Sequence, residues 1–422
     1  MTISRKRLAV RSALALALVA VAAVPLLGDL GVTGNPKDAS AAHIADRGKV
    51  ITAVSRATNY VDAFWIDADR RIMTAGFVPG SGGGWGAPAQ ISNGVGHRYT
   101  TVWSVARNQN QIDTFAVTPN NRVVSSFWNG STWSEWFQLG SLVVKEGTSV
   151  HAIGGANNID LFAIGEDDEF YTNRWTSATG WTNWTLLPGL EGLGGVAAAG
   201  TELYGVYTHS AVGIIHVYGV ITLPTNTIVL MPNDGPGHDP NYWITSGTVN
   251  ITIRNIFKPN DGGWQGWHYA MTTNKPRTSV YPVSPRPGWT TRFSTDESGQ
   301  IIYDDYSNSA GWGNPPAPLE GRPLDTSTTF AAVRKRSNVG AEVAVAVPGT
   351  DADIWTRHIG ATEVGWDEIP GTPKTGESFI MSAGEDRYNV FAWRTPSGST
   401  GEVVTAGWTA TGGWTGWTRI DD

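Results

Sequence analysis

The chain has 422 residues, among them 20 tryptophans and no cysteine, and a formal net charge of −7. Without cysteine there are no disulfide bonds and no thiolate metal sites, so stability must come from packing alone. The acidic balance argues against a nucleic-acid partner, which would require a basic face.

The first 41 residues have the three parts of an export signal. Four basic side chains between positions 5 and 11 precede an apolar run at 12–27, and small residues follow at 39–41. The run is shorter than the roughly 20 residues of a membrane-spanning helix, and small residues at this spacing are typical of signal cleavage. We therefore expect a signal peptide at 1–41, a short N-terminal segment at 42–49 and a secreted protein without membrane insertion after signal removal, with an uncleaved anchor as the alternative.

Removal of the signal would make the chain more acidic. Residues 1–41 hold five of the 30 Lys and Arg and two of the 37 Asp and Glu, so 25 positive and 35 negative side chains remain, a net charge of −10. Such a balance favours solubility and neutral or cationic ligands.

A tryptophan, mostly preceded by glycine, recurs along the rest of the chain. It stands at Trp85, Trp133, Trp181, Trp264, Trp312, Trp366 and Trp414. Successive positions differ by 48, 48, 83, 48, 54 and 48 residues. Four short strands in about 40 to 50 residues are the signature of a propeller blade. The sequence therefore predicts an all-β fold, a single β-propeller domain over 50–422.

The copy at 159–189 shows the predicted strands most clearly. A strand at 159–164 is followed by a polar turn at 165–168, a returning strand at 170–175 and a short strand with Trp181 and Trp184. An innermost strand is expected about ten residues upstream, at 150–153, which makes four strands per copy. Corresponding strand pairs are expected at 61–66 and 72–77, 112–117 and 123–128, 242–245 and 250–257, 291–294 and 301–306, 342–347 and 354–358, and 389–393 and 403–408.

The period fails between 194 and 229, where strand-like runs lack a Gly-Trp step. This segment is either an insertion or a truncated blade. The propeller therefore has seven four-stranded blades, or eight with one truncated.

The repeated form resembles the bacterial PLL-like lectins. It consists of an apolar-Asp-apolar-Phe-Ala strand, a Gly/Asp/Asn turn, a strand that ends in Trp, and Gly-Trp-x-x-Trp-x-x-Leu. The resemblance covers roughly 50–422 and implies a seven-bladed propeller that binds fucose and related sugars between neighbouring blades. The chain departs from the pattern at 194–229 and at Pro88, Pro315 and Ile369, where the second Trp is missing.

A sugar presents C–H bonds on one face and hydroxyls at its edge, so a site needs an aromatic platform and polar groups beside it. The candidate platforms are Trp128, Trp175, Trp408, Trp136, Trp184, Trp267 and Trp417, and the candidate edge residues are Asp67, Asp69, Asn120, Asn121, Asp167 and Asp168. Packing between blades is the competing interpretation for every tryptophan, and is favoured for the recurring Gly-Trp residues. Turn formation is the competing interpretation for the polar residues.

Two other functions stay open. A polysaccharide-active enzyme would need carboxylates from several blades near the axis; Asp304 and Asp305 cannot form such a pair, because adjacent strand residues point to opposite faces. The second open function is that of an interaction module without a sugar site. The eight histidines show no metal-ligand spacing, so we expect neither metal nor cofactor, although Asp234 or Asp239 could hold calcium. The preferred interpretation is a secreted, non-catalytic lectin with multivalent glycans as partners and no nucleic acid.

Overall fold

The computed structural model describes residues 51–422, which lie within one compact unit, 36–422. Its gaps are 58, 80–83, 92–98, 191–192, 194, 199–200, 202, 210–212, 225–227, 231–241, 245–248, 273–279, 284–288, 296–299, 308–310, 313–316, 320–330, 338–339, 349–352, 360–364, 372–374, 385–386, 395–400 and 410. The predicted signal peptide at 1–41, the segment at 42–49 and the possible calcium ligands Asp234 and Asp239 lie outside the described residues. No helix in the described ranges is long and apolar enough to cross a membrane.

Seven antiparallel sheets, here called blades 1 to 7 in chain order, and one two-stranded ribbon make up the described part of the chain. The strands of blades 1 to 3 are β1 (Ile51–Ala57), β2 (Tyr60–Ile66), β3 (Ile72–Val78), β4 (Gly84–Trp85) and β5 (Ala89–Gln90); β6 (Thr101–Asn108), β7 (Gln111–Val117), β8 (Arg122–Trp128) and β9 (Phe137–Val143); and β10 (His151–Gly155), β11 (Asn158–Ile164), β12 (Phe170–Thr176), β13 (Gly180–Trp181) and β14 (Thr185–Leu186).

The strands of blades 4 to 7 follow the same order. They are β15 (Val196–Ala197), β16 (Tyr204–His209), β17 (Ile214–Leu223), β20 (Val249–Lys258) and β21 (Gly263–Thr272); β22 (Tyr281–Val283), β23 (Trp289–Thr295), β24 (Ile301–Ser307), β25 (Gly311–Trp312) and β26 (Ala317–Pro318); β27 (Ala331–Ser337), β28 (Gly340–Pro348), β29 (Ile354–Ile359) and β30 (Asp367–Glu368); and β31 (Thr375–Gly384), β32 (Arg387–Arg394), β33 (Glu402–Thr409), β34 (Gly413–Trp414) and β35 (Thr418–Arg419). The ribbon is β18 (Ile228–Leu230) with β19 (Tyr242–Ile244), and the short 3-10 helix Pro259–Asp261 joins β20 to β21.

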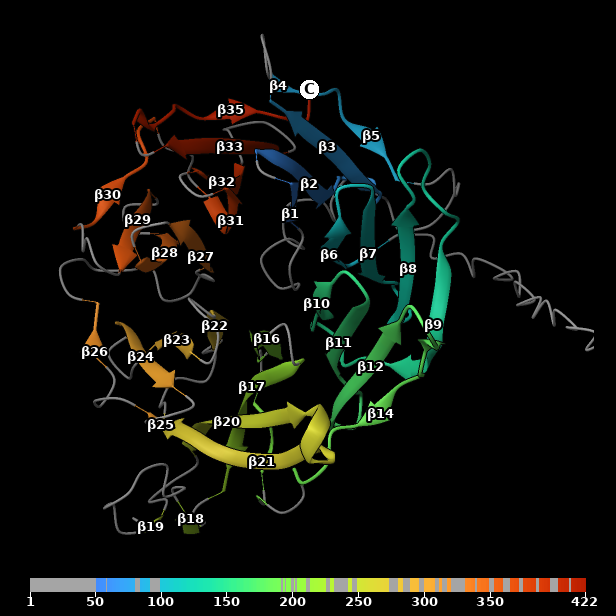
Figure 1. Cartoon of the computed structure of the whole chain (residues 1–422), viewed down its shortest axis with the longest axis vertical. Coiled ribbons are helices and arrows are strands. Elements are labelled where there is room, and N and C mark those ends of the chain that lie inside the picture. Colours follow the sequence, from blue (N-terminus) through green and yellow to red (C-terminus); the bar gives the residue numbers. More distant parts are fainter. Residues whose placement is uncertain are drawn as a thin grey trace, which may run out of the picture. The chain divides into compact units, whose positions relative to one another are not determined.

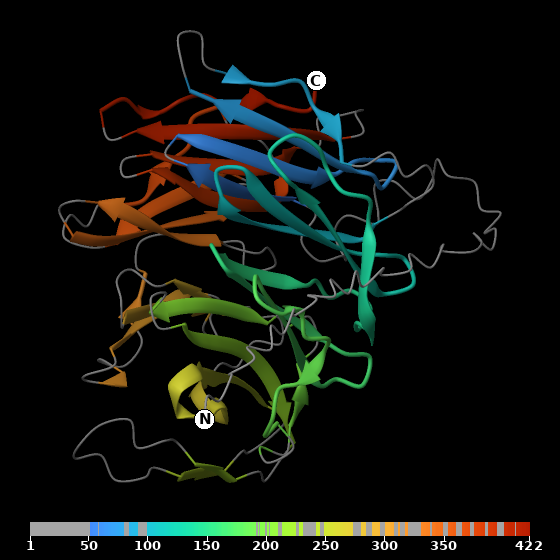
Figure 2. The same ribbon diagram turned by 45° about the vertical axis from the view of Figure 1, so that its right-hand side comes forward.

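The innermost strands close a ring. Each first strand contacts the first strand of the next blade, in the order β1, β6, β10, β16, β22, β27 and β31, and β31 contacts β1 again. Figure 1 shows these strands around the centre, with β9, β14, β21, β30 and β35 at the periphery. Figure 2 shows the strands of blade 1, in blue, side by side in one twisted sheet. The predicted seven-bladed β-propeller is confirmed, and the eight-bladed alternative is wrong.

The second strand of a blade is buried on both faces because the blade is covered by a neighbour on each side. In β11, six consecutive residues from Ile159 to Ile164 are buried. The apolar clusters accordingly span neighbouring blades: Phe64 of blade 1 and Ile112 of blade 2 belong to one cluster, and Phe115 and Leu161 of blades 2 and 3 to the next. The core of this fold thus lies between its blades.

The turns between the second and third strands repeat one backbone conformation. Arg70, Asn121 and Asp168 occupy the same turn position in blades 1 to 3, and all have a positive φ, of 62°, 58° and 67°. Asn and Asp tolerate this conformation better than most residues do. The Asn and Asp residues of these turns are therefore explained by the backbone conformation that the turn requires.

Blade 4 explains the long gap in the tryptophan period. Residues 194–229, expected to be an insertion or a truncated blade, contain β15, β16 and β17, which join β20 and β21 in one sheet. Residues 242–244, predicted to belong to the fourth copy's sheet, pair instead with β18. The extra residues lie between the second and third strands, so they lengthen the spacing to Trp264 without adding a blade.

Candidate functional site: the seams between blades

Four of the recurring tryptophans, Trp85, Trp133, Trp181 and Trp264, hold neighbouring blades together. Each packs edge-to-face on a second-strand phenylalanine of the preceding blade, with ring centroids 5.7 to 6.1 Å apart and ring planes 86° to 88° apart. The pairs are Trp133 with Phe64, Trp181 with Phe115, Trp264 with Phe162, and Trp85 with Phe391. The packing interpretation is confirmed for these tryptophans, whose geometry is the one that aromatic quadrupoles prefer.

The second tryptophan of the repeat also packs at the boundary with the preceding blade in blades 2, 3 and 4. Trp184 donates its indole N–H to the carbonyl oxygen of Leu139 at 2.7 Å, and Trp136 lies 4.9 Å from the ring of Tyr99. Trp267 packs on Phe170 and is only 4% exposed, so it offers no open face to a ligand. Trp136, Trp184 and Trp417 are half-buried.

The strand-end tryptophans lie at one register position of the third strand. Trp128 pairs with Ile112, Trp175 with Ile159 and Trp408 with Tyr388, while Phe77 and Phe257 hold the same position in blades 1 and 4. All five rings are half-buried. Their position at the strand end places them at the seam, where they retain partial access to solvent.

A cationic or imidazole side chain of the preceding blade covers four of these rings. The guanidinium of Arg107 lies 4.4 Å from the ring of Trp175, that of Arg174 lies 4.8 Å from Phe257, and that of Arg387 lies 4.2 Å from Phe77. At Trp408 the neighbour is the His358 ring, at 4.7 Å. The repeated seam is therefore an aromatic ring of one blade facing a polar, hydrogen-bonding group of the blade before it.

In blades 1 and 2 the seam arginine is paired with a second-strand aspartate six residues later in the chain. Arg107 donates to both carboxylate oxygens of Asp113, at 2.6 and 3.2 Å, and Arg56 donates to Asp62 at 2.5 Å. Burial raises the pKa of both carboxyls, an effect that the attached arginine only partly offsets.

Asp160 occupies the corresponding position in blade 3, 3.7 Å from Arg174. None of these arginines was predicted as a site residue from the sequence. The spacing of Arg56 to Asp62, repeated between Arg107 and Asp113, is the signal that could have identified them.

The predicted polar edge residues lie far from the strand-end tryptophans. Asn120 and Asn121 precede β8, whereas Trp128 ends it, and seven residues at about 3.3 Å each separate the two by roughly 20 Å. The same holds for Asp167 and Asp168 relative to Trp175.

These turn residues bond locally. Asp67 accepts the backbone N–H groups of Asp69 and Arg71, and Asp69 also pairs with Arg71. Asp167 accepts the hydroxyl of Tyr171, and Asp168 pairs with Lys145. The structure therefore does not bring the two halves of the predicted site together, and the groups beside four of the strand-end rings are Arg107, Arg174, Arg387 and His358 instead.

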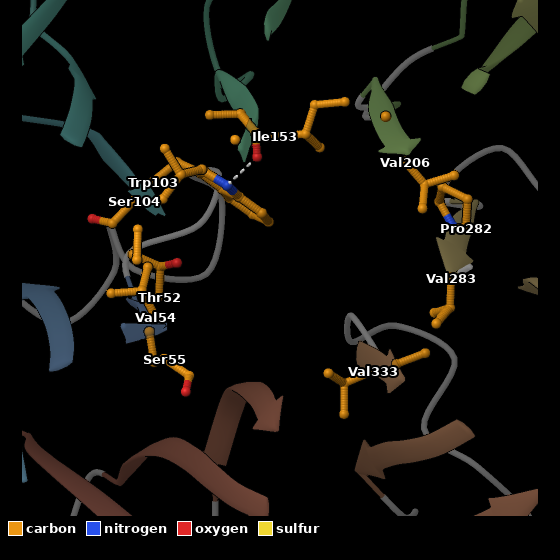
Figure 3. Close-up of a pocket in the computed structure, with 17 residues that line it drawn as sticks. Thr52, Val54, Ser55, Trp103, Ser104, Ile153, Val206, Pro282, Val283 and Val333 are labelled. Atoms are coloured by element: carbon orange, nitrogen blue, oxygen red, sulfur yellow. Dashed lines mark hydrogen bonds between the residues drawn. The ribbon is translucent and has the colours of Figure 1, made fainter. Parts of the chain in front are cut away.

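The axis of the ring contains a cavity of about 440 Å³, walled by the innermost strands (Figure 3). Its described lining residues include no Asp, Glu, Lys, Arg or His. Within the described ranges, no three His, Asp or Glu side chains are grouped as metal ligands would be. The carboxylates Asp304 and Asp305 are engaged separately, the first with Arg292 and the second with Thr291.

No protein-family model and no curated protein matches this chain. Among solved structures, it is similar to the lectin BP39L from Burkholderia pseudomallei, with 18% identity, a TM-score of 0.65, and coverage of 89% of this chain and 99% of that one. It is also similar to a variant of AofleA from Arthrobotrys oligospora, with 13% identity, a TM-score of 0.50, and coverage of 79% and 92%. At these identities the likeness shows the β-propeller fold.

Proposed function

We propose that this protein is a secreted, non-catalytic lectin that binds glycans at its blade seams. The observation that carries the proposal is the seam between blades 2 and 3, where Arg107 of one blade, paired with Asp113, lies over the half-buried ring of Trp175 in the next. An indole face fits the C–H face of a sugar, the guanidinium supplies donors for its hydroxyls, and the carboxylate supplies acceptors. One similar solved structure is itself a lectin, which agrees with this proposal.

Arg107 now occupies the ring face that a sugar would use. The Arg107 side chain is only 9% exposed, and a desolvated cation–π contact is worth about 2 kcal/mol or more. A hydrogen bond to a charged group contributes about 1.5–3 kcal/mol. A sugar that displaces the guanidinium from the ring and receives its N–H groups therefore gains about as much free energy as it loses, so each site should bind weakly.

The seams are chemically unequal, so we propose that the sites differ in affinity. The seam before blade 3 holds the Arg107–Asp113 pair and Trp175, the seam before blade 7 holds His358 and Trp408, and the seam before blade 1 has a phenylalanine in place of tryptophan. Several weak sites on one ring give avidity for multivalent glycans. Fucose and related sugars are the class we propose, on the resemblance of the repeat.

Glycan-array binding of the chain from residue 42 onward tests the proposal. We expect binding to fucosylated or related glycans, with tryptophan fluorescence quenched by the best ligand, and no hydrolysis of that ligand. The absence of binding to any glycan on the array would contradict the proposal.

A further inference from the structure

The seams leave the axial cavity unused, and its lining is unusually uniform. Six equivalent positions in the innermost strands carry a β-branched aliphatic residue, each paired with the second-strand residue at the position of Asp113. They are Val54, Val105, Ile153, Val206, Val283 and Val333, and all six line the cavity. Met381 holds this register position in blade 7. Aliphatic side chains of six of the seven blades thus line the cavity.

An indole forms one wall of the cavity. Figure 3 shows Trp103 on one side of an open centre, with Val206, Pro282 and Val283 on the other. The indole N–H donates to the carbonyl oxygen of Ala152 at 2.9 Å, and its ring lies 4.3 Å from that of His151. The indole is therefore held in a fixed orientation.

Two of the three hydroxyl side chains of the lining are bonded within the protein. The hydroxyl of Ser104 bonds that of Thr114 at 3.0 Å, and Ser55 donates to the carbonyl oxygen of Ala57 at 3.1 Å. Thr52 is fully buried, so its hydroxyl does not open into the space. No charged group is among the described lining residues, and apolar atoms make up the larger part of the surface offered to an occupant.

A volume of about 440 Å³ is much larger than the voids that close packing leaves, and it falls in the range of small-molecule sites. The cavity is open toward solvent, so an apolar guest that enters it displaces water from the aliphatic and indole side chains. The described side chains offer a sugar no charged group and few hydroxyls, so they suit an apolar guest better. We propose that the axial cavity is a second binding site, for an uncharged, apolar small molecule with a ring or short hydrocarbon chain, separate from the glycan seams.

Titration of the chain from residue 42 onward with the uncharged probe N-phenyl-1-naphthylamine tests this site. We expect saturable fluorescence enhancement with one site per chain, undiminished by a saturating glycan. Ala332→Phe, which fills the cavity, should abolish the enhancement. Val78→Phe adds the same ring at a strand end that is 50% exposed and should leave it unchanged.

Val333→Thr supplies a second test that preserves side-chain shape. A hydroxyl introduced among apolar walls should weaken probe binding by about tenfold, while near-ultraviolet circular dichroism and glycan binding stay as in the parent. Unsaturable enhancement, equal binding by the parent and both cavity variants, or displacement of the probe by glycan would overturn the proposal. The first two outcomes leave sugar binding at the seams untouched, whereas displacement of the probe by glycan would place a sugar in the cavity itself.

Discussion

At the scale of single residues, tryptophans at different positions of the repeat have different roles: some pack between blades and others are available to a ligand. Trp267 is almost completely buried between blades, whereas Trp175 keeps part of its ring at the seam. Burial predicts a stability role for the first, and partial access next to Arg107 predicts a ligand role for the second.

Alanine substitution separates these two tasks. Trp267→Ala should lower the free energy of unfolding by about 3–5 kcal/mol, since it removes a large buried ring. Trp175→Ala should cost less stability and should weaken glycan binding. Denaturant titration and glycan titration of both variants check this. Equal loss of stability with unchanged binding in Trp175→Ala would contradict the assignment.

Arg107 and Asp113 should act as a unit. Asp113→Asn leaves the guanidinium without its anionic partner, so Arg107 is no longer oriented toward the seam. We expect weaker glycan binding in this variant, and little further loss when Arg107→Ala is added. A double-mutant cycle on glycan affinity measures this coupling, and additive losses would show that the two residues act independently.

His216 makes stability depend on pH. Burial lowers its pKa well below the usual value, and the nearby charges of Arg254 and Lys258 add to this effect. The unfolded chain therefore binds a proton below about pH 6.5 that the folded chain does not, and stability falls as the pH drops through this range. Denaturant titration at pH 7 and pH 5.5 should show a smaller loss in His216→Gln than in the parent, whereas equal losses would exclude His216 as the cause.

At the scale of strands, one glycine permits close contact between blades 3 and 4. A Cβ atom at Gly205 of β16 would lie 2.4 Å from the ring of Phe162 in β11, although the backbone conformation itself would accept alanine. Gly205→Ala should therefore lower the free energy of unfolding by about 1–3 kcal/mol through overpacking. Adding Phe162→Leu should recover part of this loss in denaturant titrations; a purely additive effect would argue against this contact.

Strand positions were predictable where the repeat was intact. The strand predicted at 112–117 is β7, Gln111–Val117, and the one at 159–164 is β11, Asn158–Ile164. The pattern failed in blade 4 because alternation identifies a strand but not its partner, and β19 pairs outside the blade. Only part of the site was predictable. The aromatic positions follow from the repeat, whereas the contact of Arg107 with Trp175 joins two blades and cannot be read from either copy alone.

At the scale of the whole molecule, the same kind of seam recurs around the ring, with an aromatic side chain at the end of a third strand and, in four cases, an arginine or histidine of the preceding blade facing it. Because the strand-end rings of Trp128, Trp175 and Trp408 belong to separate seams, alanine at each should lower glycan binding in steps. Binding to a glycan-coated surface, measured at one protein concentration for chains with one, two and three of these substitutions, checks this. Complete loss from one substitution would indicate a single site.

Isothermal titration of the chain from residue 42 onward with the best monovalent glycan tests the central claim most directly. We predict a stoichiometry above one sugar per chain, which falls when Trp128, Trp175 and Trp408 are all replaced by alanine in a chain that remains folded. Unchanged affinity and stoichiometry in that triple variant would contradict the assignment of sugar binding to the blade seams.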